Sequence, residues 1–194
     1  MRLEDKEKKV EEKKGPDMGD KLLKTRSVML SGEINKDLSE KIINQLLVLE
    51  QDDSEKEIKI FINSPGGDVD AGYAIYDMVR FISCPVLMIG TGLVASAASL
   101  VLLAVPKEKR IGLPNSTYLI HQPMSGMKGV ASDIEIYSKQ IEKLRLKLDS
   151  VIAHATDKTV EEVKKDTERD HWLFSEEALE YGLINRIVTN RSEL

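Results

Sequence analysis

The chain of 194 residues lacks several features that would assign a protein to a class at first sight. Its single cysteine, Cys84, can form no internal disulfide, so a reducing compartment is expected. A formal net charge of -5 argues against a nucleic-acid binder that relies on a basic surface. The sequence shows neither an apolar signal segment nor an apolar run long enough to span a membrane. We therefore expect a cytoplasmic protein that binds neither nucleic acids nor membranes.

The chain is predicted to consist of a charged arm, residues 1–17, and one domain, residues 18–194. Within residues 1–14, only Leu3 and Val10 are apolar apart from Met1, which is too little apolar surface to bury. We expect a flexible arm, or alternatively an arm that folds against a partner. The remaining residues suffice for a single full-sized core.

Strand-like and helical segments alternate along the domain, which predicts a parallel α/β core with right-handed crossovers. The expected strands are residues 27–30, 58–62, 86–90 and 117–120. The expected helices are residues 38–50, 69–81, a segment from near Ser96, 160–167 and 175–181. Residues 107–110 are expected to form a polar loop, and residues 168–172 a change from helix to loop.

Ser96 is the first candidate functional residue, in the small and apolar run Gly92–Val105. A serine at a helix N-terminus lies beside backbone N–H groups and the positive end of the helix dipole, which suit an attacking alkoxide and an oxyanion. Small residues in such a run also serve close packing, and Val94 and Ala98 replace the glycines of G-x-S-x-G. Ser96 alone leaves both interpretations open.

Two more candidates follow strand ends. Gly66 and Gly67 permit positive φ and close approach of another backbone, so they form either a plain turn or a loop whose Gly67 N–H binds a carbonyl. His121 directly follows a predicted strand, whereas His154 and His171 are expected in solvated surroundings. Because ligands bind at the carboxyl ends of parallel strands, these candidates and Ser96 should line one crevice.

Ser132 and Glu135 predict a capping box that opens a long helix. Its apolar residues recur at alternating steps of three and four, as in a heptad pattern. They are Ile134, Tyr137, Ile141, Leu144, Leu148 and Val151. The helix either packs in the core or projects and meets its copy in another subunit, and the densely charged opposite face favours projection.

Six motifs in the same order resemble the proteolytic subunit of Clp protease (the ClpP family) over about residues 20–191. They are Phe61-Ile62-Asn63-Ser64-Pro65-Gly66-Gly67, Ala95-Ser96, Leu113-Pro114-Asn115-Ser116, Ile120-His121-Gln122-Pro123, Asp133-Ile134-Glu135-Ile136 and Asp166-Thr167-Glu168-Arg169-Asp170. The resemblance implies the α/β crotonase-like superhelix of ββα units with a projecting handle helix.

The same resemblance implies a serine endopeptidase that cleaves unfolded polypeptides through an acyl-enzyme. Ser96 would be the nucleophile, His121 the general base and Asp170 the residue that orients the imidazole. Gly67 and Ala97 would form the oxyanion hole. The implied substrate-binding residues are Asp68, Val69, Met124, Ser125 and Gly126. No metal or cofactor is implied in this chain, because ATP is used by the partner ATPase.

Members of the family stack two heptameric rings into a tetradecamer through the handle. The residues implied in these contacts are Asp133, Ile134, Tyr137, Ile141 and Arg169. A AAA+ Clp ATPase would dock on a groove that contains Phe61, Ile89, Ile111, Leu113 and Val188. Lys59 and Thr91 are expected to make this groove more polar than is usual.

Two departures from the family pattern leave alternatives open. Ala97-Ala98 stand where Met-Gly is usual, which predicts an altered substrate pocket, and the charged arm replaces an apolar pore loop. The chain is therefore either self-sufficient or a subunit of a mixed ring that is active only with a paralogue. Another alternative is an acyl-CoA enzyme of the crotonase type, which shares the fold but needs no Ser-His-Asp set. The last alternative is a scaffold without activity.

Overall fold

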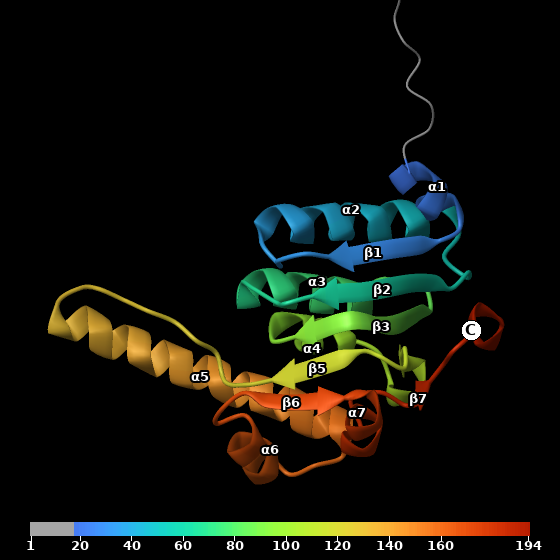
Figure 1. Cartoon of the computed structure of the whole chain (residues 1–194). Coiled ribbons are helices and arrows are strands. Elements are labelled where there is room, and N and C mark those ends of the chain that lie inside the picture. Colours follow the sequence, from blue (N-terminus) through green and yellow to red (C-terminus); the bar gives the residue numbers. More distant parts are fainter. Residues whose placement is uncertain (1–17) are drawn as a thin grey trace, which may run out of the picture.

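A mostly parallel sheet forms the centre of the computed structural model, which describes residues 18–194 (Figure 1). The predicted charged arm, residues 1–17, lies outside the described residues. Within the described part the strands are β1 Ser27–Ser31, β2 Ile58–Ser64, β3 Val86–Ala95, β4 Arg110–Gly112, β5 Thr117–Ile120, β6 His171–Phe174 and β7 Arg186–Ile187. The strand order is β1-β2-β3-β4-β7. Strand β5 also pairs with β3, and β6 runs antiparallel to β5.

Seven α-helices and two short 3₁₀ helices accompany the sheet in the described residues. The α-helices are α1 Met18–Lys24, α2 Lys36–Asp52, α3 Val69–Phe81, α4 Ala97–Leu102, α5 Ala131–Thr156, α6 Val160–Asp166 and α7 Ser175–Tyr181. The 3₁₀ helices are η1 Lys107–Lys109 and η2 Arg191–Glu193. Residues 18–194 contain no helix that is both long and apolar enough to cross a membrane.

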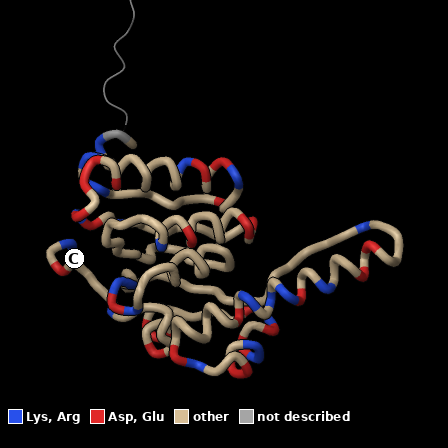
Figure 2. Tube along the Cα trace, turned by 180° about the vertical axis from the view of Figure 1, so that it is seen from behind, with Lys and Arg blue, Asp and Glu red and all other residues tan. Residues whose placement is uncertain are grey.

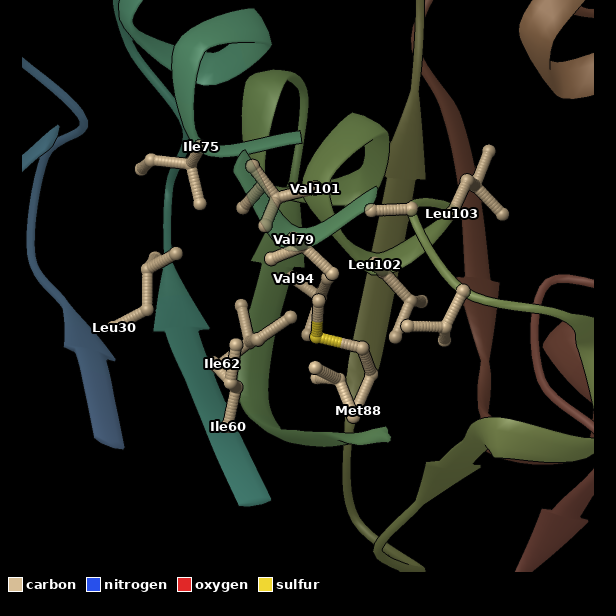
Figure 3. Close-up of a cluster of buried hydrophobic side chains, with 14 of the residues drawn as sticks. Leu30, Ile60, Ile62, Ile75, Val79, Met88, Val94, Val101, Leu102 and Leu103 are labelled. Carbon is tan, nitrogen blue, oxygen red and sulfur yellow. The ribbon is translucent and has the colours of Figure 1, made fainter. Parts of the chain in front are cut away.

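The core lies between the sheet and the helices that follow its strands (Figure 3). Ile60 and Ile62 of β2 and Met88 of β3 point toward Val79 of α3 and Val101 of α4, and all five side chains are buried. Buried and less buried residues alternate in β2, because successive side chains of a strand face opposite sides of the sheet. Burying each large aliphatic side chain contributes about 1.5–3 kcal/mol, so these positions fix the register of the central strands.

Strand β3 is longer than the predicted strand 86–90, because it continues through a bend at Gly92 to Ala95. Its first half pairs with β4, and residues 93–95 pair with β5. Gly92 has φ +57°, and a Cβ there would lie 2.8 Å from Oδ1 of Asn63, so the bend requires glycine. The partner strand β5 explains why the segment after Gly92 is extended rather than helical.

Helix α5 does not begin with the predicted capping box. Its N-cap is Val130, and the backbone N–H groups of Asp133 and Ile134 donate to the Val130 carbonyl oxygen at 3.0 and 3.1 Å. Glu135 instead pairs with Lys139 one turn later, with Oε1 and Nζ 2.7 Å apart. The prediction that Ser132 is the N-cap was wrong, because the helix begins at Ala131 and Ser132 lies within its first turn.

Two short strands, β4 and β6, interrupt segments that were predicted to be a polar loop and a change from helix to loop, and the short strand β7 was not predicted. Arg110 begins β4 rather than ending a polar loop, and its buried guanidinium donates from Nη2 to the Ala155 carbonyl oxygen at 2.7 Å. His171 begins β6, is half-buried, and its ring centroid lies 5.6 Å from that of Tyr181. These strands were missed because strands this short carry no clear alternation of their own and depend on their pairing partners.

The C-terminal end of α2 is closed by the side chain of Arg26, the residue directly before β1. Arg26, which has a left-handed φ of +53°, donates from its guanidinium to the carbonyl oxygens of Leu49, Asp53 and Lys56 at 2.9, 2.8 and 2.9 Å. Carbonyl groups at a helix end have no partner within the helix. Arg26 therefore satisfies them and joins β1 to the loop before β2.

Tyr118 of β5 is a fully buried side chain without a polar partner. Its hydroxyl forms no hydrogen bond within residues 18–194, and burial raises its pKa to about 12. Gly90 and Gly112 make room for it, because a Cβ at either position would lie 2.5 or 2.3 Å from the hydroxyl oxygen. The neighbouring Ser116 hydroxyl donates to the Gly90 carbonyl oxygen instead, at 2.9 Å.

Candidate active site

Ser96 occupies a sharp turn between β3 and α4. Its φ of +56° and ψ of −121° are uncommon for a residue with a side chain, and such strain persists where surrounding structure holds it. The Ser96 N–H donates to the Leu119 carbonyl oxygen at 2.9 Å, and the Ser96 carbonyl oxygen accepts from Ser99 at 2.9 Å. A strand–turn–helix arrangement of this kind exposes the hydroxyl of a nucleophilic serine.

The structure brings together the three residues predicted to form a triad. The Ser96 Oγ lies 2.8 Å from Nε2 of His121, and Nδ1 of His121 lies 2.9 Å from Oδ1 of Asp170. The His121 side chain is 9% exposed and that of Asp170 57%. When the imidazole carries its proton on Nδ1, this N–H donates to the Asp170 carboxylate. Nε2 is then unprotonated and can receive the Ser96 proton. The geometry can therefore transfer a proton from the serine to the imidazole.

Pairing between β5 and β6 explains how residues so distant in sequence meet. Ile120 is paired with His171, so the residues that flank this pair, His121 and Asp170, lie next to each other. Gln122 reinforces the arrangement, because its backbone N–H donates to the Thr167 carbonyl oxygen at 2.7 Å. Its side-chain amide also donates to the Glu168 carbonyl oxygen at 2.7 Å.

Beside the nucleophile, two backbone N–H groups are free to bind an oxyanion. Neither the Gly67 nor the Ala97 N–H donates a hydrogen bond within residues 18–194. The loop that carries Gly67 packs directly on the Ser96 turn, because a Cβ added to Gly66 would lie 2.7 Å from Ser96 Cβ and 2.9 Å from Ala97 N. This close approach explains the glycine at position 66, whereas a Cβ at Gly67 would lie 2.3 Å from the Ile34 carbonyl oxygen.

A small cavity of about 30 Å³ opens next to Ser96 and His121. Val69, one of the predicted substrate-binding residues, belongs to its lining. The other apolar lining residues are Ala97, Leu100, Ile120, Pro123, Leu148 and Ile152. Sequence reasoning did not assign Leu148 to the site, although the apolar stripe of the long helix includes it, because only the packing of α5 on α4 brings it there.

The other predicted substrate-binding residues are placed differently. Asp68 is the N-cap of α3, with its carboxylate accepting from the Ala71 N–H at 2.7 Å, and its own N–H donates to the Ile34 carbonyl oxygen at 2.8 Å. Residues 124–126 are exposed, and their backbone groups form no hydrogen bond within the described chain. The Ser125 hydroxyl contacts that of Tyr137, which joins this segment to α5.

The residues predicted to mediate subunit contacts lie on exposed surface. Figure 1 shows the first half of α5 projecting from the body, with residues 121–130 leading to its tip. Asp133 and Ile134 are exposed there, Tyr137 and Ile141 are half-exposed, and Arg169 is exposed beside the triad. Acidic and basic residues follow one another along the projecting half of the helix (Figure 2). A helix that projects in this way cannot bury its apolar stripe within one subunit.

The five residues of the predicted docking groove pack in a second hydrophobic cluster on the other side of the sheet. Phe61, Ile89, Leu113 and Val188 line a cavity of about 450 Å³, and Ile111 packs in the same cluster. Lys59 and Thr91 are not among the lining residues. Thr91 instead donates its hydroxyl to the Ile62 carbonyl oxygen at 3.0 Å. Whether these two residues make the docking groove more polar stays a prediction.

Comparisons with known proteins agree with this geometry. The Clp protease family matches residues 10–191. The ATP-dependent Clp protease proteolytic subunit 2 of Treponema denticola is 58% identical over 174 residues, which cover 90% of this chain and 87% of that protein. The proteolytic subunit 3 of Rhizobium etli is 47% identical over 173 residues, which cover 89% of each chain. The solved structure of a ClpP1 mutant from Listeria monocytogenes has a TM-score of 0.84 and 45% identity, and the match covers 91% of this chain and 98% of that chain.

These similarities confirm the predicted fold class, the crotonase-like superhelix with a handle. They also decide between the peptidase and the acyl-CoA enzyme, because the match extends over the whole domain and the relatives are proteolytic subunits. The chain is a serine peptidase that belongs to the Clp protease family.

Proposed function

We propose that Ser96, His121 and Asp170 carry out endopeptidase chemistry through an acyl-enzyme. The continuous series of hydrogen bonds from Ser96 Oγ through His121 to Asp170, at 2.8 and 2.9 Å, is the observation on which this proposal depends. A series in this order matches the roles of nucleophile, general base and orienting carboxylate.

In the acylation step, Ser96 Oγ attacks the carbonyl carbon of the scissile peptide bond while His121 Nε2 takes the hydroxyl proton. A C–O bond forms and the carbonyl oxygen becomes an oxyanion. When the tetrahedral intermediate collapses, the C–N bond breaks and Nε2 returns its proton to the leaving amine. Asp170 keeps the imidazole in the required tautomer and stabilises the imidazolium that forms.

Deacylation repeats these steps with water as the nucleophile. His121 Nε2 takes a proton from water as the water oxygen attacks the ester carbon, and the ester C–O bond to Ser96 then breaks. The imidazolium gives its proton to Ser96 Oγ, which restores the free enzyme. The unpaired N–H groups of Gly67 and Ala97 support both steps as an oxyanion hole, and each well-placed donor lowers the barrier by about 3–4 kcal/mol.

The substrate proposed for this site is an extended segment of unfolded polypeptide. The free backbone groups of residues 124–126 support pairing with an added substrate strand. The backbone N–H of Asp68 already donates to the Ile34 carbonyl oxygen, so of the residues predicted on α3 it is Val69, at the cavity, that is proposed to contact substrate. Because backbone groups are the same in every polypeptide, recognition through them depends little on the substrate's side chains, so we expect broad sequence specificity of cleavage.

We also propose that the chain works within an assembly of two stacked heptameric rings. The projecting half of α5, with Ile134, Tyr137 and Ile141 along it, supports contact between subunits. The apolar cavity lined by Phe61, Ile89 and Leu113 supports docking of a AAA+ Clp ATPase, which would unfold substrates and use the ATP. The chemistry proposed for this chain needs no metal or cofactor.

A second candidate function is that of a subunit active only in a mixed ring with a paralogue. The names of the relatives support it, because they number these proteins as subunits 2 and 3 of their organisms' Clp proteases. The intact geometry of the three polar residues distinguishes such a dependent subunit from a catalytically silent one.

Labelling of the purified full chain with a fluorophosphonate, with native mass recorded alongside, tests the proposal. Labelling should occur at Ser96, disappear in Ser96→Ala and persist in Ser132→Ala, since Ser132 is exposed and caps nothing. His121→Ala should abolish cleavage of a fluorogenic peptide, and Asp170→Ala should reduce it by about 10⁴-fold. Substantial cleavage by His121→Ala would contradict the proposed roles.

The native mass separates the two candidate functions. Labelling in a double ring of this chain alone would support a self-sufficient peptidase. The dependent subunit would be supported by two results together: the chain by itself forms only a single ring or a smaller species, and labelling appears only after a paralogue is added.

A further inference from the structure

Two side chains of α5 hold the loop that ends in Asp170. Arg145 and Asp149 lie one helical turn apart, with the Arg145 Nε 3.8 Å from Oδ2 of Asp149. The Arg145 Nη2 lies 2.5 Å from Oε2 of Glu168 and donates to the Lys164 carbonyl oxygen at 3.3 Å. The Arg145 side chain is only 18% exposed, so this ion pair is partly shielded from water. One guanidinium therefore joins α5, α6 and the segment that leads to Asp170.

Asp149 makes the second connection to the same loop. Its Oδ1 accepts from the Thr167 hydroxyl at 2.9 Å, and both residues are fully buried. Its Oδ2 forms no hydrogen bond within residues 18–194, so the nearby Arg145 guanidinium is the charge that compensates this carboxylate. Burying a carboxylate is costly without such a partner, so the position of Asp149 depends on Arg145.

The loop held by these two residues is the one that Gln122 contacts from the opposite side. The Gln122 N–H and side-chain amide donate to the carbonyl oxygens of Thr167 and Glu168, each at 2.7 Å. Residues 167 and 168 are thus clamped between α5 and the residue that follows His121. Asp170 itself is 57% exposed, and within the described residues its carboxylate hydrogen-bonds only His121.

We propose that Arg145 and Asp149 are positioning residues for the triad, which hold residues 167–168 so that Asp170 meets His121. This inference rests on the proposed catalytic role of Asp170. An exposed carboxylate with one hydrogen bond has little else to fix it, so the geometry of the loop decides where it lies. A displacement of about 1 Å at such a group can cost about 10²-fold in rate. The Arg145 hydrogen bond also lowers the pKa of Glu168.

A misplaced Asp170 would change the pH dependence as well as the rate. The Asp170 carboxylate stabilises the imidazolium that forms on His121 during the reaction, so a displaced Asp170 withdraws part of that stabilisation. Charged groups on the elements around His121 include Glu168 and Arg169 in the same loop, Arg145 and Asp149 on α5, and Asp68 and Asp70 at the beginning of α3. His171 on β6, which is paired with Ile120, is a further titratable group beside it. Residues 97–102 of α4 carry no charge.

The test is the rate of fluorophosphonate labelling of the full chain as a function of pH. Arg145→Ala should label about 10- to 100-fold more slowly than the unmodified chain, with the acidic limb of its pH profile shifted to lower pH. Arg145→Lys keeps the charge beside Glu168 and should recover most of the rate. Lys143→Ala removes an exposed positive charge from the same helix and should leave the rate and the profile unchanged.

A variant at the surface keeps the test decisive if Arg145→Ala does not fold. Glu168 is a partner of Arg145 with a 59% exposed side chain, so Glu168→Gln weakens the connection without disturbing the core. It should shift rate and pH profile in the same direction by a smaller factor. A folded Arg145→Ala or Glu168→Gln protein with an unchanged rate and profile would overturn the inference. Absence of labelling in the unmodified chain would instead contradict the proposed function.

Discussion

Replacing Gly66 with alanine should damage both stability and activity, because Gly66 touches the turn that carries Ser96. Its φ is +87°, and an added Cβ would lie 2.5 Å from the Ala95 carbonyl oxygen and 2.7 Å from Ser96 Cβ. The left-handed conformation costs about 1–2 kcal/mol with a side chain present. Relief of the collisions costs about 1–3 kcal/mol more, since the contacting atoms belong to the backbone and cannot rotate away. We expect a total loss of about 2–5 kcal/mol.

Gly32→Ala provides a matched control for the backbone effect. Gly32 has φ +91°, close to that of Gly66, but a Cβ there would meet no atom within 4 Å. Its loss should therefore be limited to the conformational cost, about 1–2 kcal/mol, partly offset by about 0.4–1 kcal/mol from the stiffer unfolded chain. The difference between the two variants isolates the collision at the nucleophile turn.

Urea denaturation and fluorophosphonate labelling measure the two effects separately. Gly66→Ala should unfold at lower urea than Gly32→Ala, and its folded fraction should label at least about 100-fold more slowly, because the Ser96 turn must shift by a substantial part of an ångström. Gly32→Ala should label at the rate of the unmodified chain. Equal unfolding midpoints and equal labelling rates for the two variants would refute the inference that Gly66 shapes the site.

Three further predictions concern the framework around the site. Tyr118→Phe removes a buried hydroxyl that has no partner, so urea denaturation should show a gain of about 1–3 kcal/mol, and a loss would mean that the hydroxyl is satisfied. Arg26→Ala removes three charged hydrogen bonds at the end of α2 and should cost about 2–4 kcal/mol in the same assay; a change below about 0.5 kcal/mol, the size typical of an ordinary surface substitution, would contradict the capping role. The pKa of Glu168 is lowered by its hydrogen bond to Arg145, so Glu168→Gln should be less stable than the unmodified chain above about pH 4.3. That difference should disappear as the pH falls below the folded pKa, and a pH-independent difference would refute the ion-pair explanation.

The central elements of the fold were predictable because their burial is written in local patterns. The alternation of Ile58, Ile60 and Ile62 identified β2, and the bounds of α3 and β5 agree with the prediction. Patterns of this kind report which side of an element faces the core. The strands β4, β6 and β7 were not predicted: β4 begins in a segment assigned to a polar loop, β6 in one assigned to a change from helix to loop, and all three are fixed by partners distant in sequence.

The start of α5 shows the opposite failure, in which a local sequence motif is present but the structure that it predicts does not form. Ser132 and Glu135 have the spacing of a capping box, yet the helix begins at Ala131 and Glu135 pairs with Lys139. The motif offers one way to satisfy the first N–H groups of a helix. In this chain residues 121–130 lead into the helix so that Val130 is the N-cap, and its carbonyl oxygen accepts from the N–H groups of Asp133 and Ile134.

The sequence by itself determined the chemistry of the candidate site. Ser96, His121 and the glycine pair after β2 were singled out by their places after strand ends, and Asp170 was identified from the family motifs. Those motifs are local, because a strained turn, a tight glycine loop and a strand end each need particular residue types at neighbouring positions.

Only the tertiary structure decided how these parts work together. The antiparallel pair Ile120–His171 brings Asp170 to His121, and the packing of α5 brings Leu148 to the cavity and Arg145 to Glu168. None of these contacts follows from a local pattern, since the paired residues are far apart in sequence, by 23 positions for Arg145 and Glu168 and by 49 for His121 and Asp170. A residue's own type states what it can donate, accept or bury, but its partner is fixed by the three-dimensional arrangement of the whole chain.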